Sequence, residues 1–342
     1  MTTPNDPRIR VAVLMGGPSH EHDISLKSGK NVCAVLSEEN CDVTPVVILE
    51  DGHFQIDGGV SMSPCDALSG LLESRVEVAF LALHGEACED GAIQGFLEWA
   101  GLPYTFSGVE ASVLAMNKCA FKSLLIQQEI ATPAFSIIDQ TQWNDDPEGV
   151  IHSGMAEVGL PAFLKASGLG SSYGVHRVTD RSEVETALNE IMGISRQALW
   201  ERAVDGVELT ASVVGDGACG GELEALRLVE IRMRDGELFD TENKYNGKAE
   251  EIVPAGVSDS VRVELQAIAI RIHSLLGCRS LSRTDAILTD EGLVVLETNT
   301  IPGMTTESLF PRAAGPRLGT LLRGMVDSAL QQPTAFRKRG AD

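Results

Sequence analysis

The sequence predicts a mixed α/β fold that opens with a doubly wound domain built on a parallel sheet. First, residues 10–15 form a short apolar, β-prone run that ends in a glycine turn and is followed by a helical pattern, the order expected at the start of such a domain. Second, residues 43–49 and 78–83 are nearly continuous apolar runs, which suit parallel strands covered on both faces. Third, 342 residues exceed the roughly 250–300 that a single core usually supports, so several domains are expected.

The pattern along the chain divides it into four parts. Residues 1–106 hold the parallel-sheet domain. Residues 107–201 form a central segment with a predicted hairpin whose tip is rich in glycine and serine. Residues 202–330 form a C-terminal segment that alternates strands and helices and contains a second, polar hairpin. Residues 331–342 are polar, and we expect them to form a loose tail.

Composition and charge exclude several classes of function. A net charge of −22 argues against a nucleic-acid surface, which needs a basic patch, but it leaves a single nucleotide possible. The chain has no run of about 18 apolar residues, so no membrane span is expected, and its polar N-terminus lacks a secretory signal, which favours the cytoplasm. None of the seven cysteines lies in a C-x-x-C pair, which argues against a disulfide framework and a structural zinc site.

The C-terminal hairpin carries the most informative group of polar residues. Glu297 and Asn299 are two apart, so on a strand they project from one face, and the hairpin brings Asp285 alongside. Two carboxylates and an amide oxygen are hard ligands that suit magnesium. The alternative is a solvated polar hairpin, which the apolar residues around these positions disfavour.

Arg283 stands two residues before Asp285 and therefore shares its face. A cation beside metal-binding carboxylates suits phosphoryl transfer or the stabilisation of an oxyanion. A structural ion pair with Asp285 or Glu297 is the alternative, and spacing alone does not decide between the two.

The glycine- and serine-rich stretch at residues 167–174 can present backbone N–H groups to an anion. It is not a Walker A motif, because no Gly-Lys-Ser/Thr follows. By composition alone a mobile linker is the better interpretation. Lys165, just before the stretch, favours a phosphate loop.

Four further polar residues follow or bracket predicted turns. Glu201 and Glu208 could accept hydrogen bonds from adenine and ribose, or could be exposed hairpin charges. His84 follows a buried strand at the sheet edge where ligands of open α/β sheets bind, although a capping histidine is a close alternative. Glu21 belongs to the first glycine turn at the same edge, and a solvated acid in the first turn of a helix is its alternative.

Taken together, these features resemble the ATP-grasp superfamily and, within it, the D-alanine–D-alanine ligase family, over residues 10–330. Short motifs in a fixed order carry the resemblance. They are Gly16-Gly17-Pro18-Ser19-His20-Glu21, Ala82-Leu83-His84-Gly85, Glu89-Asp90-Gly91, Met116-Asn117-Lys118, Gly170-Ser171-Ser172, Lys244-Tyr245, Arg283-Thr284-Asp285 and Glu297-Thr298-Asn299-Thr300-Ile301-Pro302-Gly303-Met304-Thr305.

The resemblance implies an ATP-grasp fold that uses ATP as a co-substrate with two magnesium ions, for which manganese can substitute. Lysines would contact the phosphates, and glutamates would hold adenine and ribose. The implied ATP-binding residues are Lys118, Lys165, Ser171, Ser172, Glu201, Val204, Glu208 and Lys244. The implied metal ligands are Asp285, Glu297 and Asn299.

The resemblance also implies roles toward two D-alanine molecules. Glu21 would meet the ammonium of the first, with His84 near its carboxylate, and Ser308 with Leu309 would receive the carboxylate of the second. The other implied catalytic residues fall into two groups. Arg283 and the Gly303 N–H would form an oxyanion hole, and Tyr245 and Ser171 would join Glu21 in a hydrogen-bonded set.

The function so implied is ATP-dependent formation of D-alanyl-D-alanine through an acyl phosphate, as a step in peptidoglycan precursor synthesis, by a cytoplasmic enzyme. A homodimer is usual in the family. Two alternatives remain: a related ligase with D-lactate or D-serine as the second substrate, and a nucleotide-binding protein without catalysis. The presence of Arg283, Asp285, Glu297 and Asn299 argues against the second alternative.

Overall fold

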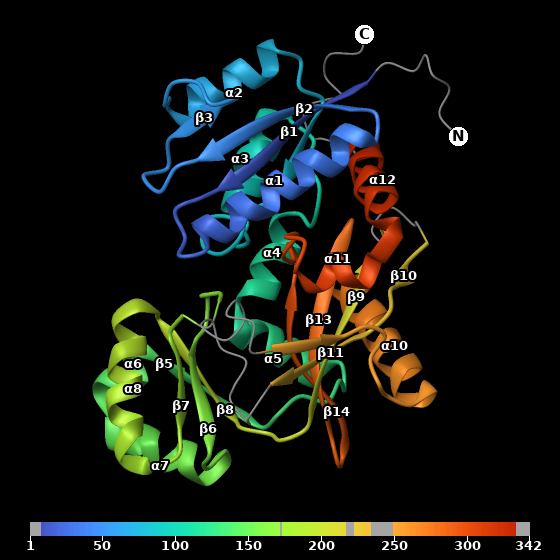
Figure 1. Cartoon of the computed structure of the whole chain (residues 1–342). Helices are drawn as coiled ribbons and strands as arrows, with labels where there is room; N and C mark the ends of the chain where they lie inside the picture. The colour runs from blue at the N-terminus through green and yellow to red at the C-terminus, as the bar shows by residue number, and fades with distance from the viewer. Residues whose placement is uncertain (1–7, 172, 217–221, 234–248, 333–342) are drawn as a thin grey trace.

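A computed structural model of the chain describes residues 8–171, 173–216, 222–233 and 249–332, and arranges them around three β-sheets (Figure 1). Each predicted segment up to residue 330 contains one sheet. The fold class expected from the sequence is confirmed: a mostly parallel N-terminal sheet precedes two antiparallel ones. Within the described residues, no helix is both long and apolar enough to cross a bilayer.

The first sheet has the strand order β3-β2-β1-β4. Its central strand β1 pairs in parallel with β2 and β4, whereas the short edge strand β3 runs antiparallel to β2. The last six residues of β1 are all buried, as its apolar run requires. The strands are β1 (Ile9–Gly16), β2 (Cys41–Ile48), β3 (Phe54–Ile56) and β4 (Val78–Leu81), and the helices are α1 (His22–Glu38), α2 (Pro64–Glu73) and α3 (Ala92–Ala100).

Helix α1 packs closely on β1 because its inward face is made of small residues. Ser25, Ser28 and Gly29 are buried there. A Cβ atom on Gly29 would lie 2.4 Å from the Cβ of Met15, so only glycine fits. The close approach brings the first turn of α1 to the carboxyl edge of the sheet. His84 and the polar residues of the glycine turn lie at this edge.

The second sheet is antiparallel, with the order β5-β8-β6-β7. Its three helices share an apolar core with the strands, and Figure 1 shows them on the side turned away from the other two sheets. The predicted hairpin is present as β6 and β7. The elements are β5 (Phe135–Asp139), α6 (Gln140–Asp145), α7 (Pro147–Glu157), β6 (Ala162–Ala166), β7 (Val175–Val178), α8 (Arg181–Ile194) and β8 (Gln197–Arg202).

The third sheet is antiparallel, with the order β12-β11-β9-β13-β14 and β10 beside β9. Helices α4, α5 and α10 pack on it, although α4 and α5 precede the second sheet in the chain. The elements are α4 (Val109–Met116), α5 (Lys118–Gln127), β9 (Val207–Val214), β10 (Glu224–Ala225), β11 (Val229–Met233), β12 (Ala249–Ile252), α10 (Asp259–Leu276), β13 (Leu281–Thr289) and β14 (Gly292–Asn299).

The chain ends by returning to the first sheet. After α11 (Leu309–Ala314) and a short 3-10 turn, α12 (Leu318–Gln331) packs beside α1. Its buried residues Leu322, Met325 and Val326 belong to the same apolar cluster as the strands of the first sheet. The helix therefore runs into the start of the predicted tail, whose residues 333–342 lie outside the described part.

Candidate active site

The glycine turn after β1 places Glu21 at the carboxyl edge of the first sheet. Gly16 and Gly17 adopt φ values of 89° and 105°, which favour glycine. The Ser19 hydroxyl donates to the His84 carbonyl at 2.6 Å and accepts from the Glu21 N–H at 3.2 Å. A Cβ on Gly85 would lie 3.1 Å from Glu21 Oε2. The turns after β1 and β4 thus meet, as the doubly wound topology predicts.

His84 is 4% exposed and is held by helix α1. Its Nε2 lies 3.0 Å from the Ser28 hydroxyl. Burial lowers the pKa of His84 below its ordinary value, and the positive charge of Arg283 lowers it further, against the opposite effect of Glu21. The imidazole is therefore neutral near pH 7, and Glu21 and Arg283, from different sheets, both act on it.

Glu89 is a partly buried acid that the sequence motifs include without a role. Its Oε2 accepts from the Gly85 N–H at 2.8 Å. Burial, and then the charge of Glu21, raise the pKa of Glu89 to about 8. Its carboxyl group is therefore mostly protonated at neutral pH, which keeps one negative charge out of the space around Glu21.

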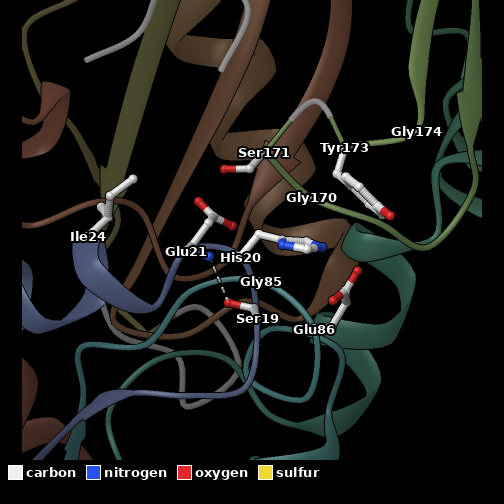
Figure 2. Close-up of a pocket in the computed structure, with 10 residues that line it drawn as sticks. All are labelled: Ser19, His20, Glu21, Ile24, Gly85, Glu86, Gly170, Ser171, Tyr173 and Gly174. Carbon is white, nitrogen blue, oxygen red and sulfur yellow. Dashed lines mark hydrogen bonds between the residues drawn. The ribbon is translucent and has the colours of Figure 1, made fainter. Parts of the chain in front are cut away.

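The tip of the β6–β7 hairpin closes a pocket of about 280 Å³ over the glycine turn (Figure 2). Ser171, at φ 50°, and Glu21 point into the same space. The ring centroids of His20 and Tyr173 lie 4.5 Å apart. The pocket is lined by Ser19, His20, Glu21, Ile24, Gly85, Glu86, Gly170, Ser171, Tyr173 and Gly174.

The polar hairpin predicted near the C-terminus is β13 and β14, and its residues share one face. Asp285 is the cross-strand partner of Glu297, and Arg283 that of Asn299. Arg283 donates to both Asp285 oxygens, at 2.8 and 2.7 Å, and the Asn299 amide donates to Asp285 Oδ2 at 3.1 Å. The ion pair considered from the sequence therefore exists. An arginine has five N–H donors, of which Asp285 takes two.

The donor set of this hairpin fits magnesium. Directly opposed residues of an antiparallel pair have Cβ atoms roughly 5 Å apart, so one ion can contact both carboxylates. Among the described residues no cluster of three or more His, Cys, Asp or Glu is arranged for a metal. Two carboxylates with an amide oxygen are the sparse, all-oxygen set that magnesium accepts when substrate phosphates supply further ligands.

The lysines expected at the nucleotide lie between the central and C-terminal sheets. Lys118 Nζ donates to the Leu169 carbonyl at 2.6 Å and so reaches the glycine-rich loop. Lys165 pairs with Glu201 Oε1, and Lys122 lies 2.5 Å from Glu201 Oε2. Burial alone would raise the pKa of Glu201, but the two ammonium groups outweigh it and hold the value at about 2.

Glu201 is only 1% exposed, so the alternative of an exposed hairpin charge is wrong for this residue. Glu208 lies on β9 opposite Ile287, and Val204 lies in the link from β8 to β9. Both therefore lie close in the chain to Glu201. Ser172, Lys244 and Tyr245 lie outside the described residues.

The loop after β14 reaches back to the first sheet. The Met304 N–H donates to the Ser28 hydroxyl at 3.3 Å, and the Asn31 amide donates to the Met304 carbonyl at 2.8 Å. Gly303 therefore lies near the helix that holds His84. A Cβ on Gly303 would lie 2.8 Å from Ser308 Oγ. Ser308 begins helix α11, and the Leu309 side chain that follows is buried in the core.

Sequence reasoning missed Lys122, which is 1% exposed. The available signal was its spacing, since it lies three residues from Cys119 and from Leu125, which form the buried face of α5. A lysine on an apolar helix face needs a buried partner. The partner, Glu201, is distant in sequence and could not be identified from spacing.

Comparison with known proteins assigns the family. Residues 10–67 and 65–107 match the family description "D-ala D-ala ligase N-terminus", and residues 124–330 match "D-ala D-ala ligase C-terminus". The chain belongs to the D-alanine–D-alanine ligase family. A D-alanine–D-alanine ligase from Desulforamulus reducens is 37% identical over 330 residues, which cover 95% of this chain and 99% of that protein. Enzymes of this family use ATP and Mg²⁺.

Solved structures of the same family share the fold. The D-alanine-D-alanine ligase from Coxiella burnetii superposes with a TM-score of 0.79 at 25% identity and covers 95% of this chain and 94% of its own. The VanG D-Ala:D-Ser ligase from Enterococcus faecalis gives a TM-score of 0.78 at 25% identity, with 94% and 99% covered.

Proposed function

We propose that this chain is the ATP-dependent ligase that joins two D-alanine molecules through an acyl phosphate, for peptidoglycan precursor synthesis. One observation carries the assignment of the site. The Ser28 hydroxyl of α1 lies 3.0 Å from Nε2 of the buried His84 and also accepts from the N–H of Met304, in the loop that follows β14. This contact supports a single reaction space shared by the predicted amino-acid pocket and the predicted metal hairpin, as a ligase of this type requires.

The first D-alanine binds in the pocket over the glycine turn. The Glu21 carboxylate pairs with its ammonium group, and neutral His84 offers a hydrogen bond to its carboxylate. Protonated Glu89 supports this arrangement, because an ionised acid beside Gly85 would repel the incoming carboxylate. The pocket volume of about 280 Å³ is compatible with a small amino acid.

A carboxylate is a poor acyl donor, and ATP converts it to an acyl phosphate that the second amine attacks. When bound, Mg²⁺ neutralises charge on the phosphates, and Asp285, Glu297 and Asn299 would hold it. Lys118 and Lys165 bind phosphate oxygens, and Glu201 and Glu208 hold adenine and ribose. Ser171, Ser172, Val204 and Lys244 complete the predicted ATP-binding set, in which backbone N–H groups of the glycine-rich loop would face the phosphates.

Arg283 and the Gly303 N–H stabilise the tetrahedral oxyanion, and Ser308 with Leu309 receives the second carboxylate. An oxyanion donor contributes about 3–4 kcal/mol. By family resemblance, Tyr245 joins Ser171 and Glu21 across the closed site. Exclusion of water by the β6–β7 hairpin protects the acyl phosphate from hydrolysis. We also propose a cytoplasmic homodimer.

The test is product analysis with competing second substrates. The protein is supplied with ATP, Mg²⁺ and D-alanine, with D-lactate or D-serine added at equal concentration, and products are identified by mass spectrometry. We expect ADP and D-alanyl-D-alanine to dominate near neutral pH. A dominant product with D-lactate or D-serine would replace the substrate pair. Absence of ADP formation with every substrate would remove the ligase assignment and favour a nucleotide-binding protein.

A further inference from the structure

Lys122 is a fully buried cation that the proposed mechanism does not use. It projects from α5, and its ammonium meets one partner from each of three segments. Nζ lies 2.5 Å from Glu201 Oε2 on β8, 2.5 Å from the Thr132 hydroxyl and 3.1 Å from the Val295 carbonyl on β14. An ammonium has three donors, and these partners account for all three.

The partners of Lys122 are themselves fixed. The Thr132 hydroxyl donates to the Val295 carbonyl at 2.8 Å, and the Val295 N–H donates to the Ala131 carbonyl at 2.8 Å. The segment after α5 is therefore bound along β14, the strand that carries Glu297. Lys122 cannot leave this position without breaking contacts between the central and C-terminal sheets.

Lys165 holds the other oxygen of Glu201 but is placed differently. Its side chain is 17% exposed, against 1% for Lys122, and it stands at the start of the glycine-rich loop. Its role toward the phosphates requires it to turn away from Glu201 when the nucleotide binds. Glu201 then retains one cation, and the oxygen that Lys165 leaves becomes an acceptor.

We propose that Lys122 is a positioning residue for the base of the nucleotide: it fixes one carboxylate oxygen of Glu201, so that the other is presented to the exocyclic amine of adenine. This inference rests on the proposed function, because it takes Glu201 to be the adenine acceptor. The charged groups that face Lys122 are Glu201, Lys165 and Glu297. A buried carboxylate without Lys122 would lose its orientation and part of its charge compensation.

The proposal predicts a change in base preference. Inosine triphosphate (ITP) carries a carbonyl oxygen where ATP carries the amine, so a fixed carboxylate attracts ATP and repels ITP. In Lys122→Met we expect the KM for ATP to rise about 10- to 100-fold, the range for losing a charge-assisted hydrogen bond, with a much smaller change in kcat. The preference for ATP over ITP should fall by a similar factor. Lys30→Met, at an exposed position of α1, is the control and should change neither.

A mutant cycle with Glu201→Gln separates positioning from a general structural effect. If Lys122 acts through Glu201, Lys122→Met should change the ATP preference no further in the Glu201→Gln background. Calorimetric binding of ADP and of inosine diphosphate repeats the comparison without turnover. Lys122→Met alone could fail to fold because it leaves a buried carboxylate unpaired. In that case the comparison of Glu201→Gln with the double variant Glu201→Gln/Lys122→Met decides, because neither contains that carboxylate.

Two results would overturn the proposal. One is an unchanged KM and an unchanged ATP preference in folded Lys122→Met. The other is a further loss of preference when Lys122→Met is added to Glu201→Gln. A native protein that forms no ADP from ATP and D-alanine would instead contradict the proposed function itself, before any variant is compared.

Discussion

Glu201 and Glu89 show how single glutamates are given opposite charge states in one protein. Glu201 meets two ammonium groups, which hold its pKa at about 2. Desolvation of the Glu89 carboxyl group and the like charge of Glu21 raise its pKa to about 8. Environments that separate the pKa values of like groups also separate their roles. Glu201 is suited to accept hydrogen bonds, and Glu89 is suited to remain neutral beside a carboxylate.

At the same scale, Glu297 is the residue on which the metal assignment depends. Because Glu297 faces Asp285 across the hairpin, Glu297→Ala removes one of two opposed carboxylates. We expect ligation to fall by at least about 100-fold, beyond the loss typical of groups that only support a ligand, with an unchanged circular dichroism spectrum. Glu291→Ala, at the exposed hairpin turn, should keep normal turnover. Near-normal ligation in Glu297→Ala would remove the metal site from this hairpin.

At the scale of elements, the β6–β7 hairpin joins the central sheet to the glycine turn of the first sheet. Its Tyr173 ring contacts the His20 ring, and both residues line the pocket (Figure 2). Neither residue belongs to the predicted catalytic set. We expect their contact instead to tether the loop that covers Glu21 and so to help exclude water.

Replacing the ring tests this tether. In Tyr173→Ala we expect more ATP hydrolysed per dipeptide formed, by about 2- to 10-fold, which is the range for losing one aromatic contact. Proteolysis within residues 167–174 should also be faster in the presence of ATP, Mg²⁺ and D-alanine. Tyr173→Phe keeps the ring and serves as the control. If Tyr173→Ala hydrolyses no more ATP per dipeptide formed than the native protein does, the contact does not contribute to closure of the loop.

Elements with a local pattern could be predicted from the sequence, whereas pairings between distant elements could not. The i, i+2 spacing of Glu297 and Asn299 places them on one face, and the structure pairs that face with Asp285. The antiparallel edge strand β3 is only three residues long, too short to show a pattern. Lys122 and Glu201 meet across separate sheets, and no local rule relates them. Tyr245 stays a prediction, because it lies outside the described residues.

At the scale of the whole molecule, His273 makes stability depend on pH. It is fully buried between α10 and β13, with Nδ1 2.8 Å from the Ser282 hydroxyl. Burial lowers its pKa from 6.5 to about 4, against smaller opposing effects of Asp216 and nearby backbone. As the pH falls, this histidine therefore takes up a proton at a higher pH in the unfolded chain than in the folded protein. The contribution to stability is complete above pH 6.5 and is lost as the pH falls toward 4, by up to about 3 kcal/mol.

Thermal unfolding at a series of pH values checks this linkage. His273→Gln should unfold at a lower temperature than the native protein near neutral pH, and the difference between them should narrow as the pH falls below 6.5. His152→Gln, at an exposed position of α7, should follow the native protein throughout. A difference between His273→Gln and the native protein that stays constant with pH would assign the acid sensitivity to other groups.

The return of α12 to the first sheet makes the order of synthesis matter. Among the described elements, β1 is synthesised before the others, and α12, which covers the same domain beside α1, is synthesised after them. A nascent chain therefore carries an apolar face on this domain until α12 has been synthesised and Leu322, Met325 and Val326 can cover it. A prematurely terminated product would keep that face open to chaperones and proteases. The position of α12 thus gives chaperones and proteases a means of distinguishing chains that contain this helix from chains truncated before it.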